Sequence, residues 1–362
     1  MTIPRLLPLL LATGVAACAD RAPTAPVADF DVSLSSAGAR DITVMTQNLY
    51  VGADVDLVIG ALASPDPYDD FPALLFAIET LGKTDYPARA AAIADEIARR
   101  RPHVVGLQEV SVIDIDLSGM GGPVVYLNFL EILQAELAAR GLNYTAAAQV
   151  QNTNAAPLPG ISLVDFDVLL VDADWVTITS AGGQNFTVNV GPVAPGVTLI
   201  RGWVWARTTI GDQSYTFASA HTEANLAGAP QGLLEQIRAA QVGEMVASLG
   251  SSDRVVLMGD LNDTPGSLMY QVLAGAGFTD VWAALRPGVV GLTCCHRADL
   301  SDQVAAFTQR IDYILTRGLD ASQSRLFGRI DRFGEVPGDR TAGPAYPVWP
   351  SDHVGMIATV RP

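Results

Sequence analysis

Six short segments of the 362-residue chain place an acid, an amide or a histidine where an apolar run ends or, in one case, inside the run. A carboxylate next to buried positions costs free energy unless it is paired, hydrogen-bonded or bound to a metal ion. One such residue alone is usually a cap or a turn residue. Six segments in one chain favour a shared site that gathers these groups. The residues are Asn48, Glu109, His221, Asp260 with Asn262, Asp312, and Asp352 with His353.

The motifs MTQN, GLQE, AHTE, GDLN, RIDY and SDH, in this order, resemble those of the endonuclease/exonuclease/phosphatase family. This deoxyribonuclease I-like superfamily also contains abasic-site endonucleases, bacterial sphingomyelinases and inositol-phosphate phosphatases. Each motif alone is short, and the common order over residues 41–362 carries the resemblance. It implies an α/β fold, a four-layer α/β/β/α sandwich of two mixed, mostly antiparallel sheets with flanking helices. The motifs are then expected at one edge of the two packed sheets.

The resemblance implies a metal ion with Glu109 as its main ligand and with Asn48 and Asp352 in or near its shell. The expected ion is Mg²⁺, with Mn²⁺ or Ca²⁺ as alternatives. Mg²⁺ prefers oxygen ligands and keeps several waters, so one or two carboxylates suffice. The implied reaction is phosphoester hydrolysis, which requires a neutralised anionic centre, an activated water and a stabilised leaving oxygen.

The same resemblance gives catalytic roles to His221, Asp260, Asn262, Asp312 and His353. Asp260 and Asn262 are expected to position the attacking water and a phosphate oxygen, and the two histidines to contact phosphate oxygens. Asp312 is expected to pair with His353, which fixes the ring tautomer and favours the charged form. Either His353 or Asp260 accepts the proton from water, and the sequence leaves both open.

Apolar periodicity predicts the elements that position these residues. Strands are expected from residue 42 to the QNL segment and at 103–107, 144–151, 166–171, 174–179, 186–190, 201–209, 214–220, 255–258, 311–316 and 353–360. Helices are expected at 126–140, 230–249 and near 267–275, with another opened by Pro87. Residues 50–85 read as a long loop with one helical segment at 71–81. Gly211-Asp212 predicts a hairpin turn.

The first 17 residues have the layout of a secretory signal, with Arg5 followed by an apolar run. They lead into Ala16-Ala17-Cys18, which resembles the bacterial lipobox, in which the cysteine is lipidated. We therefore expect a lipoprotein signal peptide over 1–17, a flexible tether over 18–40 that begins at the lipidated Cys18, and one domain over 41–362. The expected location is the cell envelope, anchored by lipid on the periplasmic or extracellular face. An ordinary secretion signal is the alternative.

The chain carries 22 basic and 38 acidic residues, with a net charge of −16, and Lys83 is its only lysine. An acidic surface repels nucleic acid unless a basic groove or bound cations compensate. The expected partner is a phosphoester substrate: a phospholipid head group, a small phosphoester or nucleic acid. The protein is expected to be a monomer. An extracellular nuclease of the same family is one alternative, and a catalytically inactive surface lipoprotein that binds a partner is the other.

Cys294, Cys295 and His296 are consecutive just before the RIDY motif. Two cysteines and a histidine in a row lack the spacing of a tetrahedral zinc site. An exported location permits disulfides. The sequence therefore favours a vicinal disulfide or free thiols over zinc.

Overall fold

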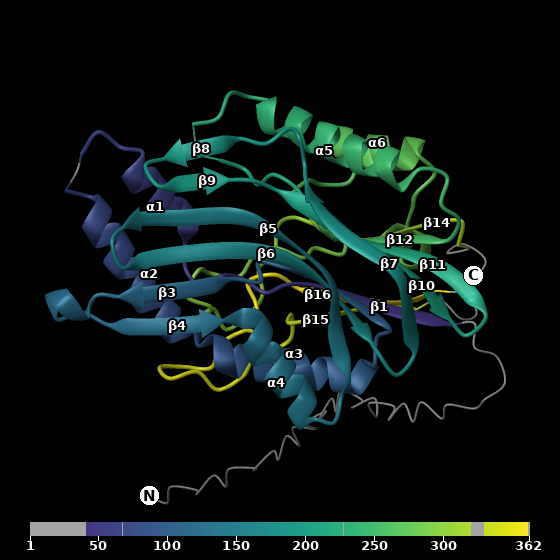
Figure 1. Cartoon of the computed structure of the whole chain (residues 1–362), viewed down its shortest axis with the longest axis horizontal. Helices are drawn as coiled ribbons and strands as arrows, with labels where there is room; N and C mark the ends of the chain where they lie inside the picture. Colours follow the sequence, from purple (N-terminus) through teal and green to yellow (C-terminus); the bar gives the residue numbers. More distant parts are fainter. Residues whose placement is uncertain (1–40, 67, 227, 320–328, 361–362) are drawn as a thin grey trace, which may run out of the picture. The chain divides into compact units, whose positions relative to one another are not determined.

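A computed structural model describes residues 41–66, 68–226, 228–319 and 329–360 (Figure 1). The expected signal peptide over 1–17 and the tether over 18–40, including Cys18, lie outside the described residues. Among the helices that the structure describes, none is long and apolar enough to cross a membrane.

The larger sheet has ten strands among the described residues, in the order β15-β16-β1-β2-β6-β5-β9-β8, with β3 paired to β6 and β4 paired to β3. Only β1 and β2 run parallel, and the other pairs are antiparallel. The strands are β1 Ile42–Asn48, β2 Val104–Gln108, β3 Val112–Asp116, β4 Val124–Asn128, β5 Tyr144–Leu158, β6 Ile161–Asp172, β8 Gly191–Ala194, β9 Val197–Leu199, β15 Arg329–Phe333 and β16 Gly355–Val360.

The smaller sheet has six strands in the described part of the chain, in the order β13-β14-β12-β11-β10-β7. Here only β11 and β12 run parallel. The strands are β7 Val176–Asn185, β10 Gly202–Ile210, β11 Gln213–His221, β12 Val255–Asp260, β13 Thr279–Asp280 and β14 Asp312–Arg317. Ile210 pairs with Gln213, so the hairpin predicted at Gly211-Asp212 is confirmed.

Helices cover the outer faces of the two sheets (Figure 1). The described helices are α1 Val55–Leu62, α2 Asp70–Thr84, α3 Tyr86–Arg100, α4 Phe129–Ala139, α5 Leu233–Leu249, α6 Leu268–Gly275 and α7 Val281–Leu285. The short helix α7 differs from the others, because its Val281 and Trp282 belong to the core between the sheets. Helices α3 and α4 pack on the larger sheet and α5 and α6 on the smaller one, while a separate apolar core lies between the sheets.

Neighbouring residues of one strand contribute to different apolar cores, because successive side chains of a β-strand point to opposite faces of the sheet. Val44 and Val104 pack with Val256 of the smaller sheet between the two sheets. Met45 and Val105 face the other way, toward α3 and α4. The predicted α/β/β/α sandwich of mixed, mostly antiparallel sheets is confirmed.

The sheets approach each other closely at Gly106 in β2. A Cβ atom on this residue would lie 2.7 Å from Met258 Cγ and from Ser219 Oγ. Two residues further on, Gln108 Nε2 donates to Ser219 Oγ at 2.8 Å. Residue 106 therefore has to be a glycine, and the ends of β2 and β11 are in direct contact.

The segment 50–85 differs most from its prediction. It forms two helices, α1 and α2, where one helical segment within a long loop was expected. The side chain of Asp54 accepts from the Leu57 backbone N–H at 3.0 Å and caps α1. An acid before an apolar run is a signal for the start of a helix. The helix was not predicted because its eight residues make only about two turns, too few for a helical spacing of apolar residues to be recognised.

Two further predictions were wrong at the level of elements. Residues 126–128, expected in a helix, complete β4, because their backbone pairs with β3 and α4 begins only at Phe129. Residues 186–190 are not in a strand. Strands β3, β8, β9, β13 and β15 were not predicted.

Candidate active site

Strand register aligns the predicted residues of the smaller sheet. His221 at the end of β11 pairs with Asp260 at the end of β12, and Asp260 pairs with Asp312 at the start of β14. Residues that pair across neighbouring strands lie side by side. The three side chains therefore share one edge of the sheet.

The larger sheet supplies further predicted site residues, which also lie at or next to the ends of paired strands. Asn48 at the end of β1 pairs with Gln108 at the end of β2, and Glu109 follows directly. Asp352 and His353 precede β16, which pairs antiparallel with β1. All of these residues lie at the carboxyl end of β1, since the start of an antiparallel strand meets the end of its neighbour.

Six of the eight predicted site residues line one cleft with a volume of about 370 Å³. The six are Glu109, His221, Asp260, Asn262, Asp352 and His353. The other two contact them from behind: Asn48 Nδ2 donates to Glu109 Oε1 at 2.9 Å, and Asp312 Oδ2 lies 3.0 Å from His353 Nδ1. The structure thus brings all eight together, and their catalytic and metal-binding roles stay predictions.

Asp260 lies at the centre of this group. Its Oδ2 atom accepts from Asn48 Nδ2 at 3.2 Å and lies 3.7 Å from His221 Nε2 and 3.8 Å from His353 Nδ1. Its Oδ1 atom accepts from the Asn262 backbone N–H at 2.9 Å. Burial raises the pKa of Asp260 to about 7, against the lowering effect of the neighbouring His353. Asp260 can therefore gain or lose a proton near neutral pH.

His353 is held in its charged form. Burial alone would lower its pKa, but the Asp312 carboxylate and then those of Asp352 and Asp260 raise it well above the usual value. Asp312 is fully buried, and its Oδ1 atom has no hydrogen-bond partner among the described residues. The imidazolium is therefore the main compensation for the buried Asp312 charge.

His221 is in the opposite state. Burial and then the Arg201 guanidinium lower its pKa well below the usual value. Arg201 Nη1 lies 3.1 Å from His221 Nδ1. Of the two predicted histidines, His221 is therefore neutral and His353 charged, which the sequence motifs did not distinguish.

Several buried ionisable residues of the cleft region were missed at the sequence level, among them Asp165, Asp167 and Arg201. Asp165 and Asp167 lie on β6, and Arg201 directly precedes β10. Burial and the nearby Glu109 charge raise the pKa of Asp165 to about 7, and burial followed by Asp165 raises that of Asp167 well above its usual value. Two acids at i and i+2 share one face of a strand. Their spacing inside an apolar run was the signal that could have found them.

Glu109 and Asp352 form the candidate metal site. Neither carboxylate pairs with a lysine or arginine within the described ranges. Burial raises the pKa of Asp352 to about 7; His353 opposes the rise and the Glu109 charge adds to it. Two oxygen-donor carboxylates without a lysine or arginine partner, one of them 4.0 Å from the His353 ring, suit Mg²⁺. The residues present therefore fit the ion that the family resemblance implies.

Asn48 presents its amide nitrogen to the carboxylates in this arrangement. The Nδ2 atom donates to Glu109 and Asp260, while Oδ1 accepts from the Tyr50 backbone N–H at 2.8 Å. Asn48 thus links the two carboxylates as a donor. Its assignment as a metal ligand stays a prediction.

Arg89 of α3 fixes the two backbone segments that carry the larger sheet's site residues. It is fully buried, and its guanidinium donates to the carbonyl oxygens of Leu49, Tyr50, Thr84 and Pro350. Leu49 and Tyr50 follow Asn48 directly, and Pro350 lies two residues before Asp352. Arg89 is therefore a positioning residue, which its place in an alanine-rich helix did not reveal.

Arg89→Met is expected to destabilise the protein by several kcal/mol, because each buried carbonyl left without a donor costs about 1–3 kcal/mol. The melting temperature should fall by about 10 °C. Arg207→Met is the control, since Arg207 is an exposed arginine on β10. That variant should melt within about 2 °C of the wild type. Equal melting temperatures for both variants would contradict the positioning role.

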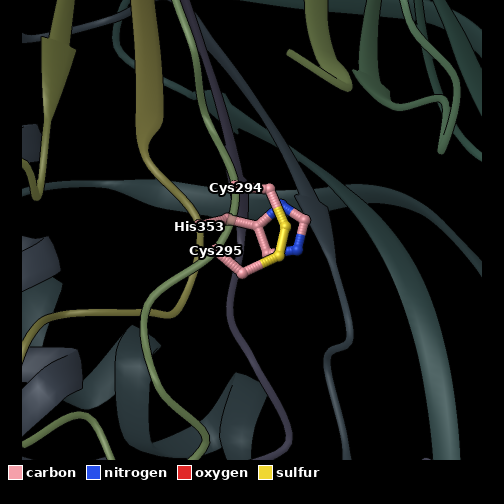
Figure 2. A group of neighbouring side chains, drawn as sticks. All are labelled: Cys294, Cys295 and His353. Atoms are coloured by element: carbon pink, nitrogen blue, oxygen red, sulfur yellow. A yellow bond between two sulfur atoms is a disulfide. The ribbon is translucent and has the colours of Figure 1, made fainter. Parts of the chain in front are cut away.

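Cys294 and Cys295 form a vicinal disulfide beside His353, as Figure 2 shows. Both cysteines line the cleft. A disulfide presents no thiolate, which is the form of cysteine that binds metal ions. The preference for a disulfide or thiols over zinc agrees with this arrangement.

The fold and the arrangement of the cleft define a class of protein. An α/β/β/α sandwich holds acids, amides and histidines at the matching ends of two packed sheets. The model of the endonuclease/exonuclease/phosphatase family matches residues 45–353, and the chain belongs to this family. No curated protein sequence matches the chain.

Solved structures with a similar fold include humanized D. rerio TDP2, at 15% identity and a TM-score of 0.52, covering 90% of this chain and 100% of that chain. A family protein from Bacteroides thetaiotaomicron has 17% identity and a TM-score of 0.52, with 88% and 94% covered. A mannosyl-6-phosphatase from the same species has 16% identity and a TM-score of 0.51, with 88% and 99% covered. At these identities the similarity concerns the fold.

Proposed function

We propose that the protein is a divalent-metal-dependent phosphoester hydrolase. The observation that carries this proposal is one cleft in which two carboxylates, Glu109 and Asp352, lie near the charged imidazole of His353 and have no lysine or arginine partner among the described residues. The carboxylates attract a cation, and the imidazolium attracts an anionic phosphate. A site with both is suited to hold a phosphoester and its metal ion together.

In the proposed mechanism, Glu109 and Asp352 would hold Mg²⁺, and the ion would neutralise phosphate charge and acidify water. His353, kept protonated by Asp312, donates a hydrogen bond to a phosphate oxygen. The oxygen of water bonds to phosphorus and gives its proton to the general base, the bond to the leaving oxygen breaks, and that oxygen takes up a proton from solvent water. The pKa of about 7 favours Asp260 over His353 as the group that accepts the proton from water.

The charges of the cleft favour a small or amphiphilic phosphoester over a nucleic acid. Seven acidic residues line it, and Arg201 is the one arginine among the lining residues that the structure describes. The basic run at 99–101 is occupied in ion pairs with Glu96, Asp331 and Asp172. A nucleic acid tracks positive charge along its backbone, and this cleft offers little.

Hydrolysis of bis-p-nitrophenyl phosphate tests the proposal. The purified domain should release p-nitrophenol with Mg²⁺, lose this activity on chelation and regain it when Mg²⁺ returns. Absence of turnover with Mg²⁺, Mn²⁺ and Ca²⁺ would overturn the proposal and favour a binding lipoprotein that has lost catalysis.

We also propose that the enzyme is exported and anchored through a lipid on Cys18, supported by the signal-like residues 1–17. Cys18→Ser is expected to release the protein from membranes, because the thioether link needs the thiol. Fractionation of cells that express both forms measures this. A soluble wild type or a membrane-bound variant would show that the lipoprotein assignment is wrong.

A further inference from the structure

An apolar pocket of about 110 Å³ adjoins the acidic cleft. It lies between helices α1 and α2 on one side and strands β3, β5 and β6 on the other. Its walls include Val58, Leu62, Leu74, Ile78, Ile113 and Ala155. An aliphatic cavity stays dry and accepts an apolar group; one of about 150 Å³ holds benzene.

The apolar pocket and the cleft share part of their walls. Val51, Val55, Ile59 and Leu163 line both. The Val51 backbone N–H also donates to Glu109 Oε2 at 2.9 Å. A molecule whose phosphate lies in the cleft can therefore extend an apolar group into the pocket past the segment that holds Glu109.

The outer surfaces of the same two helices are also apolar. Leu57 of α1 is 47% exposed, and in α2 Phe71, Leu75 and Phe76 are 42%, 41% and 51% exposed. Single exposed apolar residues need no explanation, but four on one pair of helices beside an apolar pocket suit a substrate that carries hydrocarbon. They do not suit a sugar phosphate or a nucleotide.

We propose that the apolar pocket binds the hydrocarbon chain of an amphiphilic phosphoester, whose phosphate group occupies the acidic cleft. This inference rests on the proposed hydrolase function and deepens it by naming the substrate class. The pocket is smaller than the benzene-binding example, so it should take about four carbons of the chain, and the rest should lie along α1 and α2.

A series of alkyl p-nitrophenyl phosphates with methyl, butyl and octyl chains tests the proposal. Each buried methylene improves binding about fourfold. The kcat/KM of the wild type should rise by at least tenfold from methyl to butyl and then level off toward octyl. A kcat/KM that is flat along the series would mean that the pocket is only a packing void.

Filling the pocket should remove this dependence. Ala155→Phe places a ring in the pocket, and Ala156→Phe is the matched control, because Ala156 is the next residue on β5 and is exposed. Ala155→Phe should hydrolyse the methyl ester at the wild-type rate within about threefold and lose the gain for butyl. The control should keep that gain. A gain that survives in Ala155→Phe, or is lost equally in the control, would overturn the proposal.

Ala77→Phe, on the α2 side of the same pocket, replaces Ala155→Phe if that variant fails to fold. Binding of butylphosphonate and methylphosphonate, measured by titration calorimetry with Mg²⁺, gives a readout that needs no hydrolysis. Tighter binding of butylphosphonate without turnover of any ester would reject the hydrolase function and keep the pocket assignment. Turnover without preference for butyl would reject the pocket assignment alone.

Discussion

Glu109→Gln is expected to lower kcat/KM by at least about a thousandfold while the fold stays intact. The substitution removes the charge that attracts the cation and keeps the shape of the side chain. Removal of a metal ion's main ligand forfeits several kcal/mol of transition-state stabilisation, and each 1.36 kcal/mol is a factor of ten in rate. Without Mg²⁺ the variant should be about as stable as the wild type, because relief of the repulsion between Glu109 and Asp352 offsets the loss of one acceptor for Asn48 or Val51.

Two measurements check this prediction together. Saturating Mg²⁺ should raise the melting temperature of the wild type, since a ligand that binds only the folded state stabilises it, and should leave that of Glu109→Gln unchanged. Glu79→Gln is the control, because Glu79 pairs with Lys83 on the surface of α2 and its side chain is 66% exposed. Full turnover in Glu109→Gln, or an equal thermal shift with Mg²⁺, would refute the metal assignment.

Asp312→Asn is expected to lower turnover by one to several orders of magnitude and to change its pH dependence. Activity that requires the His353 imidazolium falls as the pH rises through the pKa of that ring. Asp312 is the first of the carboxylates that raise this pKa, and an asparagine does not replace its charge. The alkaline limb of the pH–rate profile should therefore move to lower pH in the variant.

The kcat/KM of wild type and Asp312→Asn is measured from pH 5 to 9 at saturating Mg²⁺. His353→Ala should also lose orders of magnitude, and adding Asp312→Asn to it should cost little more, because the two residues act as a unit. Superimposable profiles, or losses that multiply in the double variant, would show that the pair does not act in catalysis.

The sequence predicted the sandwich and the gathering of eight site residues because both depend on strand ends. Once β11, β12 and β14 pair in register, His221, Asp260 and Asp312 have to lie side by side. The position of each polar residue at the end of an apolar run was therefore enough to predict the edge of the sheet at which these side chains meet.

Residues whose surroundings come from distant elements escaped prediction. Arg89 carries a charge in a helix and looks like a surface residue, yet it is buried where residues 49–50 and Pro350 meet. Arg201 precedes a strand, and its contacts with His221 and Glu223 form only once β10 pairs with β11. The apolar pocket depends on how α1 and α2 pack on the larger sheet. The spacing of apolar residues along a single element does not predict any of these contacts.

The pairing of the first and last strands of the described residues has a consequence for protein synthesis. β1 carries Asn48, and β16, which follows Asp352 and His353, pairs with it across more than 300 residues. Until residues 352–360 have left the ribosome, the cleft lacks Asp352, His353 and the strand that aligns them with Asn48, even when most of the larger sheet has formed. The proposed hydrolysis therefore requires β16 to join β1, so a nascent chain that stops short of β16 should be inert toward phosphoesters around it.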